Sequence, residues 1–168
     1  MTELFLVRHA IAEARDPLAW PDDSLRPLTA EGEERFRRSA RGLGRLVPVV
    51  DEVWASPYAR AWRTAELLHE EAGWPPPKRF RALEAPRSAL ETVGAFGRSP
   101  LPERVAAVGH EPNLSEVASV LLAGGPDEVA VDLKKGGAIG IVFDGAPEPG
   151  SGLLRWVLTP KTLRWLAR

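Results

Sequence analysis

The segment Leu4-Phe5-Leu6-Val7-Arg8-His9-Ala10 joins an apolar run directly to two basic side chains. Glu3 to Val7 is short, apolar and bounded by polar residues, which is typical of a buried strand. Arg8 and His9 are therefore expected at the carboxyl end of the first strand. A histidine at such a place is more often structural than catalytic, so this segment alone assigns no chemistry.

Strand-like and helix-like segments alternate along the rest of the chain. After the first strand we expect four helices: one over about residues 30–46, one opened by Pro57 and stopped at Gly73, one from Pro86 to Phe96 and one from Pro112 to Leu122. Strands are expected between them, from Asp51 to Ala55, from Phe80 to Leu83 and from Arg104 to Gly109. A hairpin of Ala138 to Phe143 and Leu153 to Leu158 and a terminal helix from Pro160 complete the chain. The alternation predicts an α/β fold, with three α/β/α layers and a mostly parallel sheet. Since no repeat or linker divides the sequence, we expect a single domain over residues 1–168.

Polar residues follow three of the expected strands, as Arg8-His9, Ser56 to Arg60 and Gly109-His110. In α/β sheets, ligands bind beyond the carboxyl ends of the strands, where helix N-termini also point. Imidazoles and guanidiniums gathered there would repel one another unless an anion lay between them. Phosphate suits such a site, because arginine donates two parallel hydrogen bonds to its oxygens and an imidazole placed in line can attack phosphorus.

Composition excludes several other chemistries. The chain has no cysteine, which excludes a disulfide framework, a thiolate zinc site and a cysteine nucleophile. Its net charge of -1 gives no general attraction to nucleic acid or to an anionic membrane. The first residues resemble neither a secretory signal nor a membrane span, and no metal-binding or Walker motif is visible. We expect a cytoplasmic protein with no nucleic-acid or membrane partner, no cofactor and no metal.

Several blocks of the sequence, in order, resemble the signatures of the histidine phosphatase superfamily, also called phosphoglycerate mutase-like. The blocks are Leu6-Val7-Arg8-His9-Ala10, Ser24-Leu25-Arg26-Pro27-Leu28-Thr29-Ala30-Glu31-Gly32, Ala55-Ser56-Pro57-Tyr58-Ala59-Arg60-Ala61 with Arg63-Thr64-Ala65, and Val108-Gly109-His110-Glu111-Pro112. Each block is weak alone, but the ordered set spans most of the chain and is specific. Ala10 stands where the family usually has glycine, a substitution that is tolerable if this residue does not need a positive φ.

The resemblance implies roles for individual residues. It implies that His9 is the nucleophile, carrying the phosphoryl group as a transient phosphohistidine. It also implies that Arg8, Arg60 and His110 form the phosphate pocket and that Arg26 binds substrate. No cofactor or metal is implied.

The proton donor is harder to assign. Glu84 follows the third expected strand, about where many relatives of this family place an acidic proton donor, but an ordinary surface glutamate is an alternative reading. Asp16, on a loop rich in proline and aspartate, is a poorer candidate.

The short chain and the block Leu25-Arg26-Pro27-Leu28-Thr29 are most similar to the bacterial phosphohistidine phosphatases of the SixA type. Longer relatives carry insertions that cap small substrates, and this chain has little room for them. The resemblance implies a phosphatase for phosphohistidine on a phosphorelay protein, such as a histidine phosphotransfer domain. The alternatives are a phosphatase for small phosphomonoesters or nucleotides, a mutase, and a binding module for phosphorylated ligands without catalysis. The sequence does not identify the physiological substrate.

Overall fold

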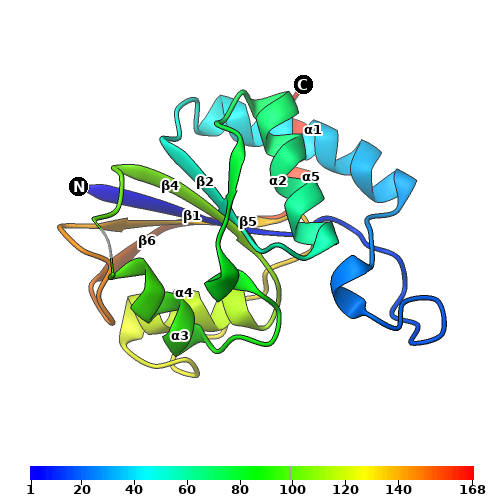
Figure 1. Ribbon diagram of the computed structural model, residues 1–168. Helices are drawn as coiled ribbons and strands as arrows, with labels where there is room; N and C mark the ends of the chain where they lie inside the picture. Colours follow the sequence, from blue (N-terminus) through cyan, green and yellow to red (C-terminus); the bar gives the residue numbers. More distant parts are fainter. Residues whose placement is uncertain (99) are drawn as a thin grey trace.

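The computed structural model describes residues 1–98 and 100–168, and its centre is a six-stranded sheet flanked by helices (Figure 1). The strands are β1 (Thr2–Arg8), β2 (Glu52–Ala55), β3 (Pro77–Arg79), β4 (Arg104–Gly109), β5 (Ala138–Phe143) and β6 (Gly152–Leu158). The α-helices are α1 (Ala30–Leu46), α2 (Ala59–Ala72), α3 (Ala89–Phe96), α4 (Asn113–Ala123) and α5 (Pro160–Leu166), and two short 3-10 helices span Asp23–Leu25 and Arg81–Leu83.

The sheet has the order β3-β2-β4-β1-β5-β6. Four strands run parallel to one another: β3, β2, β4 and β1. Strand β5 pairs antiparallel with both β1 and β6. Strand β5 therefore runs against the others, and it forms the expected hairpin with β6. The prediction of a mostly parallel sheet is confirmed.

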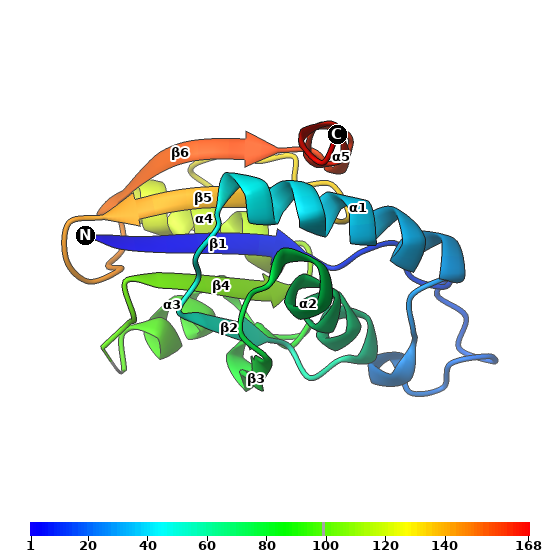
Figure 2. The ribbon, with the colours of Figure 1, turned by 90° about the horizontal axis from the view of Figure 1, so that it is seen from above.

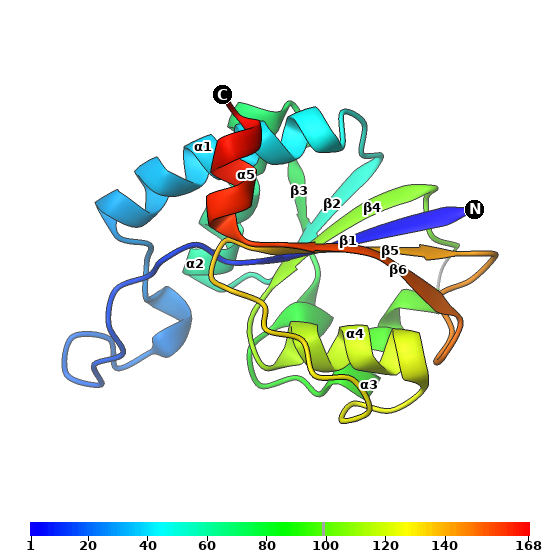
Figure 3. The same ribbon diagram turned by 180° about the vertical axis from the view of Figure 1, so that it is seen from behind.

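Helices cover both faces of this sheet. Helices α1, α2 and α5 lie on one face, and α3 and α4 lie on the other, as the views from above and from behind show (Figures 2 and 3). Strand β1 serves both layers, because Phe5 and Val7 belong to the core under α1 and α2 while Leu4 and Leu6 belong to the core under α3 and α4. A continuous apolar run is what a strand buried on both faces requires. The three-layer α/β/α architecture is confirmed.

The third strand is the clearest correction to the sequence analysis. The strand predicted from Phe80 to Leu83 is wrong, because β3 ends at Arg79 and Arg81–Leu83 forms a 3-10 turn. The apolar residues in that segment are there for packing: the Phe80 ring stacks on Trp54 at 4.7 Å, and Leu83 is fully buried. Their pattern reflects contact with the core and not pairing in the sheet.

Two helices start later than the prolines predicted. Helix α3 begins after Ser88 and not at Pro86, because Ser88 and Glu91 form a reciprocal capping box at its N-terminus. Helix α2 begins at Ala59, two residues beyond Pro57. In contrast, Thr29 caps α1 as expected, with its side chain accepting a hydrogen bond from the Gly32 N–H.

No helix within residues 1–98 and 100–168 is long and apolar enough to cross a membrane.

Candidate active site

The carboxyl ends of β1, β4 and β2 lie side by side, and the strand register brings the predicted polar residues together. Arg8 pairs with Gly109, and Ala55 pairs with Val108. Just beyond these pairs, the His9 N–H donates to the Gly109 carbonyl at 3.0 Å. The His9 and His110 rings lie 5.3 Å apart between their centroids. Two imidazoles that are far apart in the sequence thus face one site.

His9 is held in a single useful tautomer. Its ring is 6% exposed, and Nδ1 lies 2.7 Å from the carbonyl oxygen of Ala10. A carbonyl oxygen only accepts, so Nδ1 carries the proton and Nε2 keeps its lone pair. Burial, reinforced by the nearby charges of Arg60 and Arg8, lowers the pKa of His9 to about 3 despite the Ala10 hydrogen bond. The side chain is therefore a neutral, nucleophilic imidazole at physiological pH.

The loop that follows His9 has a compatible backbone. No residue other than glycine has a positive φ in the described parts of the chain, so Ala10 does not need the glycine that is usual in the resembled family. The Ala10 N–H donates to the Thr64 hydroxyl of α2 at 3.0 Å. This bond ties Ala10, whose carbonyl orients His9, to helix α2.

His110 is equally buried, with 2% of its surface exposed. Its Nε2 lies 2.8 Å from the Ser56 hydroxyl, and its Nδ1 has no hydrogen-bond partner among the described residues. Burial, together with the proximity of His9 and Arg60, lowers the pKa of His110 to about 2. This second imidazole is also neutral.

Arg60 sits on the first turn of α2 and is only 2% exposed. Its two terminal nitrogens donate to the carbonyl oxygen and to the carboxylate of Asp23, at 2.9 and 3.0 Å. The same carboxylate accepts from Arg26 Nε at 2.8 Å. Asp23 thus holds two like-charged guanidiniums next to each other.

The Asp23 carboxylate stays ionised in this arrangement. Burial alone would raise its pKa, but the hydrogen bonds and charges of Arg26 and Arg60 outweigh that effect and lower the pKa. Asp23 lies on the loop between β1 and α1, which projects from the body of the protein (Figure 1). Its ion pairs tie this loop to α2.

Arg8 reaches the site from the end of β1. One of its terminal nitrogens donates to the Leu133 carbonyl at 2.9 Å. Within residues 1–98 and 100–168, its buried Nε has no hydrogen-bond partner, and the Nε of Arg60 has none either. Both guanidiniums lie close enough to His9 to lower its pKa. His110 Nδ1 is a third buried nitrogen with no acceptor among the described residues, and buried polar groups in native proteins rarely remain unpaired.

Glu84 lies on the rim of this cluster. Its side chain is 19% exposed, and its carboxylate is 3.6 Å from the Arg87 guanidinium. Its charge reaches Tyr58, whose pKa is raised first by burial and then by Glu84. The structure thus places Glu84 near the site without a hydrogen bond to either histidine among the described residues. Asp16 lies on the exposed β1–α1 loop, where its carboxylate accepts from the Leu18 N–H.

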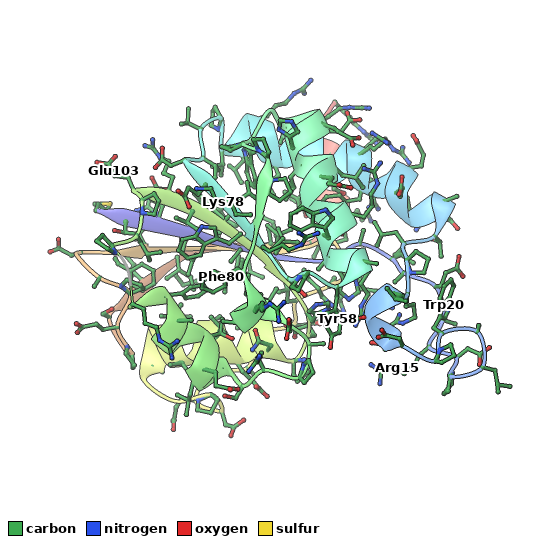
Figure 4. The ribbon with its side chains drawn as sticks, viewed as in Figure 1. Arg15, Trp20, Tyr58, Lys78, Phe80 and Glu103 are labelled. Atoms are coloured by element: carbon green, nitrogen blue, oxygen red, sulfur yellow. The ribbon has the colours of Figure 1, made fainter. Side chains whose placement is uncertain are left out.

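Three residues of the site were given no individual role by the sequence analysis: Asp23, Ser56 and Tyr58. Ser56 directly follows β2, so its position at a strand end was the available signal. The Tyr58 ring lies 5.2 Å from the His110 ring, and the Arg60 guanidinium lies over it at 5.4 Å. Figure 4 shows Tyr58 on the same side of the molecule as the projecting loop with Arg15 and Trp20, far from Glu103.

The two buried histidines predict how stability depends on pH. Their folded-state pKa values lie below 6.5, so the unfolded chain takes up protons that the folded chain does not. The free energy of unfolding should therefore fall as pH drops from about 6.5 to about 5, by up to about 1.4 kcal/mol per pH unit for each histidine. Urea unfolding followed by tryptophan fluorescence measures this slope. His110→Gln removes one of the two titrating rings, so the slope should fall by the contribution of one proton. A slope equal to that of the wild type would contradict a low pKa for His110.

Within the described residues, no group of three or more histidine, aspartate or glutamate side chains is arranged to hold a metal ion.

Comparisons of the sequence with known proteins gave one family model and one relative. The profile of the histidine phosphatase superfamily (branch 1) matches residues 4–85. An uncharacterized protein of Picosynechococcus sp. is 37% identical over 142 residues, which cover 83% of this chain and 84% of that protein.

Solved structures share the fold at lower identity. The protein histidine phosphatase SixA complexed with tungstate superposes with a TM-score of 0.81 at 22% identity, over 96% of this chain and 99% of that one. A phosphohistidine phosphatase SixA from Agrobacterium tumefaciens, described as putative, gives 0.77 at 17% identity over 95% and 98%. A mycobacterial glucosyl-3-phosphoglycerate phosphatase gives 0.66 at 15% identity over 95% and 100%. These similarities show the phosphoglycerate mutase-like fold.

Proposed function

Because this chain belongs to the histidine phosphatase superfamily, we propose that it is a phosphatase in which His9 attacks phosphorus and becomes a transient phosphohistidine. One observation carries the proposal. Among the described residues, three buried nitrogens have no acceptor, Arg8 Nε, Arg60 Nε and His110 Nδ1, and they belong to the neighbours of an imidazole whose Nε2 keeps its lone pair. A phosphoryl group supplies oxygens to those nitrogens and an electrophile to that lone pair.

The first chemical step follows from this geometry. His9 Nε2 forms a bond to phosphorus while the bond from phosphorus to the leaving atom breaks. Charge on the phosphoryl oxygens faces Arg8, Arg60 and the His110 N–H, which are already fixed by the protein and need little rearrangement. The leaving group takes up a proton as it departs.

The second step reverses the first with water as the nucleophile. Water attacks phosphorus, the bond from phosphorus to Nε2 breaks, and the water proton is released. Burial and the neighbouring guanidiniums disfavour imidazolium, so His9 returns to its neutral form. The proton stays on Nδ1 throughout and donates to the Ala10 carbonyl, which keeps Nε2 aligned for the next cycle.

The proposed chemistry needs neither metal nor cofactor. Arg8 and Arg60 provide the positive charge that a divalent ion supplies in many phosphotransfer enzymes, and Arg26 adds a third guanidinium beside Asp23. We assign Arg26 to substrate binding through that position.

Phosphohistidine on a phosphorelay protein, such as a histidine phosphotransfer domain, is the proposed substrate, and the cytoplasm is the proposed location. Two neighbours in structure are named as SixA phosphohistidine phosphatases, and this chain spans 99% and 98% of their lengths. They also superpose with higher TM-scores, 0.81 and 0.77, than the glucosyl-3-phosphoglycerate phosphatase at 0.66, which favours phosphohistidine as the substrate. A phosphatase for small phosphomonoesters is the second candidate, since a glucosyl-3-phosphoglycerate phosphatase shares the fold.

A comparison of substrates tests this choice. The specificity constant kcat/KM should be higher for a phosphorylated histidine phosphotransfer domain than for p-nitrophenyl phosphate, sugar phosphates or nucleotides. Adding EDTA should leave every rate unchanged. A preference for a small phosphomonoester would move the assignment to the second candidate, and loss of activity in EDTA that a divalent ion restores would overturn metal independence.

Glu84 remains our proposed proton donor, and its role depends on the leaving group. Glu84→Gln should slow hydrolysis of alkyl phosphates by about 10²-fold, since an alkoxide needs a proton as it leaves. p-Nitrophenyl phosphate should be affected much less, because its leaving group is stable as an anion. The matched control is Glu91→Gln on the exposed start of α3. An equal effect of Glu84→Gln on both substrates would return Glu84 to a surface role.

A further inference from the structure

Ser56 is a fully buried serine directly after β2, and its hydroxyl has two neighbours. It accepts a hydrogen bond from the Tyr58 N–H at 3.2 Å, and it lies 2.8 Å from His110 Nε2. The Ser56 N–H in turn donates to the Val108 carbonyl of β4, which fixes the serine beside the strand that leads to His110.

The proton positions in this chain of bonds can be worked out. A backbone N–H only donates, so the Ser56 oxygen is an acceptor toward Tyr58. If His110 Nε2 also donated to that oxygen, the hydroxyl proton would be buried with no acceptor among the described residues. If the hydroxyl donates to Nε2, both the donor and the acceptor of Ser56 are satisfied, which matters because an unsatisfied buried polar group is costly. The second arrangement is favoured.

The consequence for His110 is a defined tautomer. Nε2 accepts from Ser56, so the single proton of the neutral ring lies on Nδ1. Nδ1 is the ring nitrogen that has no partner in the described parts of the chain. The opposite tautomer would present a lone pair to the phosphoryl oxygens and repel them.

We propose that Ser56 is a positioning residue that holds His110 as the Nδ1–H tautomer, so that this N–H donates to the transferring phosphoryl group. The inference rests on the proposed phosphatase function for its catalytic meaning, but the tautomer itself is a property of the free protein. His9 and His110 then share one tautomer with opposite uses. His9 attacks through its bare Nε2, while His110 donates through Nδ1, and a different oxygen fixes each ring: the Ala10 carbonyl and the Ser56 hydroxyl.

Nitrogen-15 NMR of the full-length protein tests the tautomer without substrate. The chain has three histidines, so long-range proton–nitrogen spectra contain three ring systems, and His110→Gln assigns one by its loss. For His110 at neutral pH, we expect a pyrrole-type shift for Nδ1 and a pyridine-type shift for Nε2. In Ser56→Ala, both shifts should move toward values averaged over the two tautomers. A pyrrole-type Nε2 in the wild type, or unchanged shifts in folded Ser56→Ala, would overturn the inference.

Kinetics provide the second readout. Ser56→Ala should lower kcat by about tenfold, the equivalent of one hydrogen bond of about 1.4 kcal/mol. Ser119→Ala is the matched control, because Ser119 is equally buried but bonds only to the loop after α4. It should change stability without changing the His110 shifts or kcat. A wild type that shows the predicted tautomer but hydrolyses no phosphorylated substrate would contradict the proposed function and leave the Ser56 assignment intact.

Discussion

Replacing His9 with alanine is expected to reduce turnover by at least about 10³-fold, the scale seen when a nucleophile is removed from an enzyme. The variant has no group that can form the covalent intermediate, although Arg8, Arg60 and His110 remain to bind phosphate. Steady-state assays on purified protein measure the loss.

The control for this variant is His69→Ala. His69 lies on the exposed side of α2, and its Nδ1 is 2.6 Å from the Trp74 carbonyl. Of the three histidines in the chain, it is the one outside the site. His69→Ala should retain turnover. Circular dichroism must show that both variants are folded. Near-normal activity of folded His9→Ala would contradict the proposed role of His9.

Arg60→Lys is expected to lower kcat/KM by about 10²-fold, the effect of losing one preorganised donor to a developing charge. Lysine keeps the charge but loses the planar fork. In the structure, each terminal nitrogen of Arg60 donates one hydrogen bond to Asp23, which leaves Nε–H and one hydrogen on each terminal nitrogen for another acceptor. A single ammonium group cannot serve Asp23 and a phosphoryl oxygen with the same geometry.

Arg63→Lys is the matched control for Arg60→Lys. Arg63 lies one turn further along α2, where its guanidinium pairs with Glu33, Glu66 and Glu70 outside the site. Arg63→Lys should alter the urea midpoint more than the rate, and Arg60→Lys should do the opposite. If the two variants had equal turnover, Arg60 would not belong to the phosphate pocket.

The sequence allowed the strand ends to be predicted because they depend on local pattern. The apolar run before Arg8-His9 and the one before Gly109-His110 each specify a strand, and parallel strands bring their carboxyl ends to one edge. That reasoning predicts both imidazoles and Arg60 at the same edge from the sequence alone. Their individual roles depended on the resemblance to a family.

The partners of these residues could not be predicted, because they come from distant parts of the chain. The Ser56 hydroxyl and His110 are 54 positions apart, and Arg8 bonds to a carbonyl 125 positions away. Asp23 sits on an irregular loop whose path no periodic pattern describes. The strand predicted from Phe80 to Leu83 was wrong for a related reason. Its apolar residues pack against Trp54 and the core under α3 and do not pair in the sheet.

The electrostatics explain why both imidazoles can work between guanidiniums. Burial is the first cause of the low pKa of each ring, and the arginines add to it. A ring that cannot hold a second proton keeps its lone pair, which is what the nucleophile needs. The same burial costs stability in mild acid, so the pH slope of unfolding and the reactivity of His9 have a common origin.

Trapping the covalent intermediate tests the central claim most directly. Rapid acid-free quench with radiolabelled phosphoryl substrate should give a protein-bound label that is labile in acid and stable in alkali, as a phosphoramidate is and a phosphoserine is not. Peptide mapping should locate the label at His9, with none in His9→Ala and slower formation in His110→Ala. A label on His110, or normal turnover in His9→Ala, would contradict the account.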